Sequence, residues 1–356
     1  MRPKVNVRRT GAIAPLAVFA VALALAIAAE QAFAQKPRVS ETKQIEVTAT
    51  PLVGLQASNV DRRDFGRLRW RGGLVLTSSD PGFGGLSGLV LDTDGRRLLA
   101  ISDTGAWFTA DLTYNGSRPA AIRNARLGPL RALQGRPLTR NRDRDAEALT
   151  LAEGTLRNGT VLIGFEANHR IGRFPVGGSG VSAPQSYIKL PTEARQMRSN
   201  EGFESVSVLR GGRHKGAIVA FAERLPDDRG HHTGWIWLNG EPRKLHLTDI
   251  GGFDITGAAA LDDGGLIVLE RRFRWTEGVK MRLRLINAAE IAPGALMSGE
   301  VLFQADMAYR IDNMEGIAVH RGEHGETVVT VISDDNFNPF LQRTLLLQFT
   351  LKAAED

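Results

Sequence analysis

The chain has 356 residues, a formal net charge of +6 and no cysteine. Its basic excess is slight and scattered, which argues against nucleic-acid binding, and the lack of cysteine excludes disulfide and thiol chemistry. A chain of this length can bury a large hydrophobic core in one or two domains.

The N-terminus has the pattern of an export signal. Basic residues occur within positions 2–9, residues 11–29 are apolar, and Ala32 and Ala34 have the small-x-small spacing of a signal-peptidase site. A transmembrane anchor is the alternative, but such an alanine-rich segment is weakly hydrophobic for a stable span. We therefore predict a signal peptide over residues 1–34, cleavage after Ala34, and a periplasmic or secreted protein without a membrane span.

Residues 35–64 form a mixed, mostly polar leader segment, which we expect to contribute one strand. The remaining residues, 65–356, are expected to form a single domain. Only residues 289–297 in this domain have a helical pattern, and that segment is short.

Five segments of the domain repeat one pattern, in which a strand, a polar turn and a second strand follow one another. Turns such as DTDG, RNG and DDGG join the two strands, as in β-hairpins, and a third strand usually follows. The segments are residues 86–103, 146–166, 203–223, 255–270 and 314–334. Meandering strands that recur at about 50 residues predict an all-β fold, a β-propeller with five blades. A sixth blade stays open if residues 40–72 add further strands, and a β-sandwich is the alternative fold.

The two ends of the domain also have strand patterns. Residues 73–80 precede the first repeat, and residues 344–351 lie close to the C-terminus. We expect them to pair in the last blade, which closes the ring and removes exposed sheet edges. The five tryptophans are expected to pack between blades.

Acidic residues recur at fixed positions in the repeats. The second strand of every repeat ends in an acid when the repeats are aligned: Asp103, Glu166, Glu223, Glu270 and Asp334. The first, innermost strand begins with Ser87, Glu147, Glu204, Thr256 and Glu315. Each of these is followed by a small residue, as a close approach near a central axis demands. Because the two strands are antiparallel, both sets are expected at the same rim.

Such a rim has the chemistry of a cation site. Hard cations such as Ca²⁺ prefer carboxylate and amide oxygens. The predicted metal ligands are Glu147, Glu204, Glu315, Asp334, Asp335, Asn336, Asp103 and Glu223. We expect Asp334 to face the central channel, and Asp335 either to turn away or to complete the metal shell with Asn336. The alternative is that the acids cap turns or pair with Arg170, Arg224 and Arg271.

Five segments carry a family resemblance. They are LRWRGGLVLTSSDPGFGGLSGL (68–89), LLAISDTGAWF (98–108), RDAEALTL (144–151), LIVLERRF (266–273) and SDDNFNPFLQRTLLLQF (333–349). Together they resemble the phytase-like domain family, whose members are labelled "esterase-like activity of phytase". The resemblance implies hydrolysis of ester or phosphoester bonds by an exported bacterial protein.

The sequence lacks a GxSxG elbow, an HExxH motif and a P-loop. The missing motifs favour a non-catalytic propeller, but the acidic rim and the family resemblance lead us to expect a monomeric hydrolase that acts on a small-molecule ester or phosphoester at this rim. A cation would polarise the bond, Glu166 or Glu270 would act as general base, and Arg170 or Arg271 would hold an anionic oxygen of the substrate. The alternative is a non-catalytic propeller that binds a ligand or a cell-envelope partner.

Overall fold

The computed structural model describes residues 36–198 and 201–353, and nearly all regular elements in these ranges are β-strands. Residues from Arg38 onward form one compact unit. The predicted signal peptide and its cleavage site lie outside the described residues. Within the described ranges, no helix is both long and apolar enough to cross a membrane.

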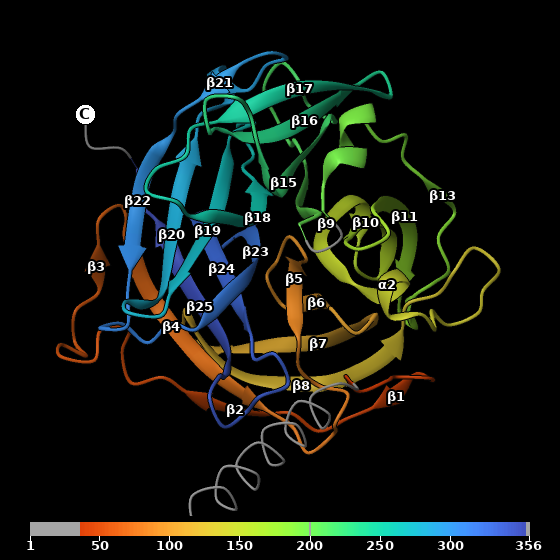
Figure 1. Ribbon diagram of the computed structural model, residues 1–356. Coiled ribbons are helices and arrows are strands. Elements are labelled where there is room, and N and C mark those ends of the chain that lie inside the picture. Colours follow the sequence, from red (N-terminus) through yellow and green to blue (C-terminus); the bar gives the residue numbers. More distant parts are fainter. Residues whose placement is uncertain (1–35, 199–200, 354–356) are drawn as a thin grey trace, which may run out of the picture. The chain divides into compact units, whose positions relative to one another are not determined.

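Five sheets follow one another along the chain and form the blades of a β-propeller (Figure 1). From the innermost strand outward, blade 1 contains β5 (Leu86–Leu91), β6 (Arg97–Ser102), β7 (Ala106–Asn115), β8 (Arg118–Pro129) and β1 (Lys43–Gln44). Blade 2 contains β9 (Ala146–Thr155), β10 (Asn158–Phe165), β11 (Arg170–Gly177), β12 (Gly180–Val181) and, also beside β11, β13 (Ser186–Tyr187). Blade 3 contains β14 (Phe203–Val208), β15 (Ile218–Pro226), β16 (His232–Leu238), β17 (Glu241–Leu247) and β21 (Leu296–Met297).

Blade 4 contains β18 (Asp254–Ala260), β19 (Leu266–Arg274), β20 (Gly278–Ile286) and β22 (Glu300–Ala305). Blade 5 contains β23 (Asn313–Arg321), β24 (Thr327–Asp334), β25 (Thr344–Leu351), β4 (Leu68–Thr77), β2 (Thr48–Pro51) and, also beside β4, β3 (Asp64–Phe65). Within the described ranges, three short helical segments interrupt the strands: α2 (Asn141–Arg144), η1 (Thr192–Gln196) and η2 (Ala288–Glu290).

Each predicted repeat forms the two innermost strands of one blade, so the predicted five-bladed β-propeller is confirmed. The helix expected over residues 289–297 is wrong. Only the single turn η2 forms at its start, and β21 forms at its end. The break has a local cause, because Pro293 lacks a backbone donor and Gly294 has a positive φ of 75°.

Strands from both ends of the described chain meet in blade 5. Strand β4 pairs antiparallel with β25, from Leu68 opposite Leu351 to Leu76 opposite Thr344. The leader segment adds three short strands, β1, β2 and β3, rather than the single strand expected. They extend the outer edges of blades 1 and 5.

The hydrophobic core lies between the blades. The described residues contain five clusters of buried apolar side chains, and each cluster joins two neighbouring blades. For example, Trp107 of blade 1 packs with Val161 and Phe174 of blade 2. Four tryptophans are buried as predicted, but Trp275 in the β19–β20 turn is 93% exposed, so its prediction was wrong. Innermost strands contact one another in the order β5, β9, β14, β18, β23 and β5 again.

Candidate metal centre at the propeller channel

Each innermost strand contains a β-bulge near its N-terminal end. The pairing with the second strand skips one residue in every blade, so that residue has no partner in the ladder. The skipped residues are Ser87, Glu147, Glu204, Thr256 and Glu315. A bulge re-aims the side chain of its extra residue, and bulges are frequent next to active sites.

All five bulge residues line one central cavity. The cavity is narrow. The centre of a water molecule can move within a volume of about 10 Å³, so the cavity has room for one water molecule or one ion. The small residue after each bulge permits this close approach. A Cβ on Gly88 would lie 2.8 Å from the Cβ of Leu149, and one on Gly257 would lie 2.8 Å from the carbonyl oxygen of Glu315.

Three of the bulge residues bring carboxylates together. One oxygen from each of Glu147, Glu204 and Glu315 lies within 4.8 Å of the other two, and all three residues are buried. Burial raises the pKa of Glu147 and of Glu204 well above the usual range, and the neighbouring carboxylates raise both further. The three charges therefore repel one another strongly unless protons or a cation neutralise them.

Further acids extend this cluster. Glu166 and Glu223 form a second close group with Glu204, and Asp145 forms a third with Glu147 and Glu166. Glu166 accepts a 2.8 Å hydrogen bond from the Gly202 backbone and shares a hydrogen bond with the carboxyl group of Glu204. Burial raises the pKa of Glu223 to about 7, with the charge of Asp254 acting in the same direction and Arg224 and Arg271 in the opposite one. We call Glu147, Glu166, Glu204, Glu223 and Glu315 the channel acids.

Two predicted ligands lie near the same rim, Asp334 at the end of β24 in blade 5 and Asp103 directly after β6 in blade 1. Burial raises the pKa of Asp334 well above its usual range, and the charges of Glu315 and Asp103 add to this effect. One oxygen of Asp334 accepts a hydrogen bond of 2.7 Å from the Asn336 backbone. The charges of Asp334 and Asp103 therefore interact with those of the channel acids, although neither residue lines the narrow cavity.

Arg271 supplies positive charge inside this acidic region. Its Nε lies 3.7 Å from Oε1 of Glu315, and its terminal nitrogen Nη2 lies 3.8 Å from Oε1 of Glu223. Burial alone would lower the pKa of Arg271, but the carboxylates of Glu315, Glu204 and Glu223 raise it. Blades 3 and 5 have a glutamate at the bulge, whereas blade 4 has Thr256 there. Blade 4 instead contributes the positive charge of Arg271 to this region.

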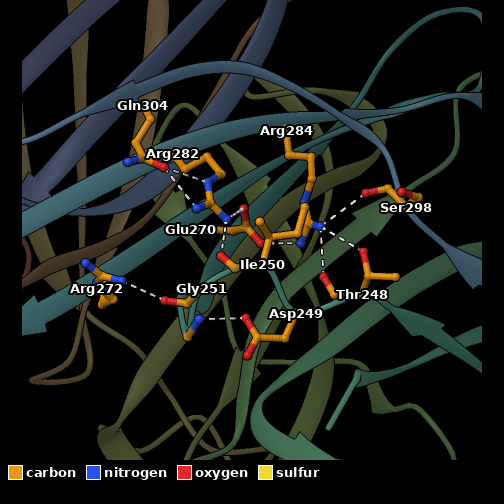
Figure 2. A network of polar contacts seen from close by, with 11 residues as sticks. Thr248, Asp249, Ile250, Gly251, Glu270, Arg272, Arg282, Arg284, Ser298 and Gln304 are labelled. Carbon is orange, nitrogen blue, oxygen red and sulfur yellow. Dashed lines mark hydrogen bonds and ion pairs between the residues drawn. The ribbon is translucent and has the colours of Figure 1, made fainter. Parts of the chain in front are cut away.

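Glu270 does not join the channel acids, because the predicted alignment of the repeats is wrong by one residue in blade 4. Glu270 pairs with Ile255 as Ser333 pairs with Met314, so Arg271 takes the position that Asp334 has in blade 5. Figure 2 shows its carboxylate between Arg282 and Arg284, both of which lie on β20. Glu270 and Arg284 are fully buried, and Arg282 reaches Glu270 at 3.5 Å. Both oxygens of Glu270 face these guanidinium groups, so the geometry gives it a structural role and removes it as a candidate general base.

The two guanidinium groups are themselves held in place. Arg284 donates to the carbonyl oxygens of Thr248 and Ser298, and Arg282 donates to the carbonyl oxygen of Ile250 and the side chain of Gln304 (Figure 2). Arg282 also stacks 3.9 Å above the ring of Phe253. The network ties β19 and β20 to residues 248–250, the loop that leads into blade 4.

Three other predicted residues, Arg170, Asp335 and Asn336, make hydrogen bonds with residues outside the channel acids. Arg170 stacks 3.7 Å above Phe165 and donates to the carbonyl oxygens of Asn168 and Asp143. Asp335 accepts from the backbones of Gly85 and Phe337 and from the Thr344 hydroxyl, all within 3.1 Å. The Asn336 side chain donates to Gln342. Both oxygens of Asp335 thus accept hydrogen bonds from within the protein, and the guanidinium group of Arg170 is held by Asp143 and Asn168.

The sequence patterns missed one basic residue of this rim. Arg144 is buried in α2 and donates to the Thr104 carbonyl oxygen at 3.0 Å and to Asn141 at 2.7 Å. Burial lowers the pKa of Arg144, whereas the charges of Asp103 and Asp145 raise it. Its position directly before Asp145 was the one available signal.

A family model described as "Phytase-like: Esterase-like activity of phytase" matches residues 81–337. The chain belongs to this family. All channel acids and Arg271 of this phytase-like chain lie within the matched range. No curated protein matches the chain.

Several solved structures are similar to this phytase-like chain at low identity. An endo-arabinase from Bacteroides thetaiotaomicron is 14% identical with a TM-score of 0.47, over 77% of this chain and 95% of that one. A gluconolactonase from Xanthomonas campestris is 11% identical with a TM-score of 0.41, over 88% and 99% of the two chains. The Cps50 (Swd1) β-propeller domain of Myceliophteria thermophila is 8% identical with a TM-score of 0.36, over 88% and 100%.

Proposed function

We propose that this chain hydrolyses ester or phosphoester bonds at the acidic rim of the channel, with the help of a divalent cation such as Ca²⁺. The observation that carries the proposal is the convergence of Glu147, Glu204 and Glu315 at three β-bulges around one narrow cavity. The description of the family, which names an esterase-like activity, supports the type of reaction.

The donor set fits a hard cation. Ca²⁺ takes six to eight oxygen ligands, and three glutamates that each offer one or two oxygens supply about three to six of them, with water completing the shell. The cavity has room for one ion. A cation would also relieve the repulsion that raises the pKa of Glu147 and Glu204.

The other residues of the rim have complementary roles. A bound cation would polarise the scissile bond and lower the pKa of a water molecule. Glu166 would accept the proton of an attacking water, and Glu223, with its pKa of about 7, would carry that proton at neutral pH. Arg271 would hold an anionic oxygen of the substrate through its guanidinium group.

A second candidate is a propeller in which the cation serves stability or ligand binding alone. The narrowness of the cavity and the burial of Glu147, Glu204 and Glu315 favour it, because a substrate atom has little space to reach that depth. Catalysis requires that the reacting bond lie above the cavity, beside Glu166, Glu223 and Arg271.

Activity assays distinguish the two candidates. Purified protein is incubated with p-nitrophenyl acetate, p-nitrophenyl phosphate and phytate, each with Ca²⁺ and with EDTA. We expect turnover of at least one substrate that depends on Ca²⁺ and falls about 100-fold or more in Glu166→Gln. Glu153→Gln, a change of an exposed acid on the same blade, is the matched control. No turnover of any substrate would reject the hydrolase and leave the cation-binding propeller.

We also propose that the chain is exported and works as a monomer in the periplasm or outside the cell. The N-terminal pattern of basic, apolar and small residues supports this. N-terminal sequencing of protein recovered from a bacterial host tests it, with Gln35 as the expected first residue. A mature protein that still begins at Met1 would contradict the proposal.

A further inference from the structure

A second cavity lies between blades 2 and 3. Its volume is about 530 Å³, within the range of about 300–1,000 Å³ that small-molecule sites occupy. Blade 2 contributes Arg173 and residues 187–189. Blade 3 contributes residues 213–218, from the loop between β14 and β15, and residues 237–240, from the turn between β16 and β17. We call this cavity the basic groove.

The basic groove is separate from the channel acids. Residues 213–217 follow the C-terminal end of β14, whereas Glu204 lies next to its N-terminal end. A strand of six residues at about 3.3 Å per residue places these two ends roughly 20 Å apart. An inference about the groove therefore does not depend on the function proposed for the channel.

The groove is strongly cationic. Arg173, Lys189, Arg213 and Lys215 line it together with His214, and none of its lining residues is acidic. Lys189 has the shortest ion pair of these cations, with Glu241 at 2.7 Å, and both side chains of that pair are well exposed, so water screens the pair.

The other cations of the groove are available to a ligand. Arg173 lies 3.7 Å from an exposed glutamate, Glu153. Arg213 donates only to the Ile291 carbonyl oxygen, and Lys215 makes no ion pair with any described residue. Guanidinium groups match the planar oxygens of phosphate and carboxylate groups. Several such cations in one concave site attract an anion that carries more than one charge.

An aromatic ring completes the lining. Tyr187 of β13 is 38% exposed and lies beside the cationic residues. A ring of this kind packs against the apolar face of a sugar or another carbon ring. We propose that the basic groove binds a small polyanion, a carbon ring that carries phosphate or carboxylate groups.

Four probes test the ligand class by isothermal titration calorimetry at low ionic strength. They are glucose 6-phosphate, glucose, inorganic pyrophosphate and citrate. We expect glucose 6-phosphate to bind and glucose not to bind, and we expect added salt to weaken the binding. Binding of pyrophosphate or of citrate supports the role of the cationic side chains and identifies whether the groove prefers phosphate or carboxylate. If no anionic probe binds, the proposal is rejected.

Variants then locate the binding. Arg173→Gln combined with Lys215→Gln removes two charges from the groove. Neither side chain is buried, so this double variant is expected to have the melting temperature of wild type. We expect this pair to weaken anion binding at least about tenfold. Arg118→Gln combined with Arg123→Gln, two exposed residues of β8, makes the same change in net charge elsewhere and should leave the affinity unchanged. Equal weakening by both pairs would overturn the site.

The ring contact has its own test. Tyr187→Ala should weaken glucose 6-phosphate while leaving pyrophosphate unchanged, because only the sugar has an apolar face to lose. Equal effects on both probes, or none, would remove Tyr187 and the carbon ring from the proposal.

Discussion

An acidic side chain of this propeller takes its role from the cations around it. Glu223 and Glu270 align in the sequence, but in the strand pairing Glu270 corresponds to Ala222 and Arg271 corresponds to Glu223. Glu270 is buried between Arg282 and Arg284, whereas Glu223 has Arg271 at 3.8 Å and a pKa of about 7. The sequence repeat predicts the acid at each position, but the partners of Glu270 lie on the next strand, β20. Their pairing follows from the register of β19 with β20.

The role of Glu270 can be measured through stability. Glu270→Gln leaves two buried guanidinium groups without a counter-charge, which typically costs about 3–5 kcal/mol. We expect urea unfolding to show this loss equally with Ca²⁺ and with EDTA, because the residue lies outside the channel acids. A loss of unfolding free energy that depends on Ca²⁺ would contradict this role and show that Glu270 takes part in binding the cation.

His320 gives the fold a dependence on pH. Burial lowers its pKa from the ordinary 6.5 to about 4, and the charged groups around it are Arg71, Asp94, Glu326 and Arg210. Above pH 6.5 His320 is neutral in both states. As pH falls from 6.5 to 4, only the unfolded state binds the proton, so stability is lost, by up to about 3 kcal/mol.

Thermal melting at several pH values tests His320. We expect the melting temperature of wild type to fall between pH 6.5 and 4 by more than that of His320→Gln. His324→Gln, a change of an exposed histidine in the next turn, should behave as wild type. Identical pH profiles for wild type and His320→Gln would show that this residue does not contribute.

At the level of strands, the bulges decide where the acids point. The sequence places Glu147, Glu204 and Glu315 at the start of an innermost strand, and the small residue after each is the visible trace of close packing. The bulge itself cannot be predicted from the pattern, because it is a mismatch between two strands. The leader likewise shows no strong pattern, since its short strands depend on edges that blades 1 and 5 provide.

The interface between the neighbouring strands β7 and β8 of blade 1, where Trp107 pairs with Gly128, makes a prediction about glycine. A Cβ on Gly128 would lie 2.2 Å from the ring of the buried Trp107, so Gly128→Ala must displace the ring or the strand. Overpacking of this kind costs about 1–3 kcal/mol, and we expect the melting temperature to fall by several degrees. Gly178→Ala, where the added Cβ meets nothing within 4 Å, is the control and should melt as wild type. An unchanged melting temperature in Gly128→Ala would mean that this interface is loosely packed.

For the whole molecule, repetition made the architecture predictable, because each blade repeats one pattern of strands and turns. Features that arise once were not predictable in the same way. Arg144, the network around Glu270 and the basic groove all depend on residues that are distant in the chain and adjacent only in the folded ring.

The account depends most on the claim that the channel acids bind a cation. The most direct test compares melting temperatures in Ca²⁺ and in EDTA for wild type, Glu204→Gln and the exposed control Glu153→Gln. Glu204 belongs to two of the three close carboxylate groups found among the described residues. We predict that Ca²⁺ raises the melting temperature of wild type and of Glu153→Gln, since a ligand of the native state stabilises it. Glu204→Gln should lose this shift and melt no lower than wild type in EDTA, because it removes a buried repulsion. Equal melting of wild type in both buffers would contradict the metal centre.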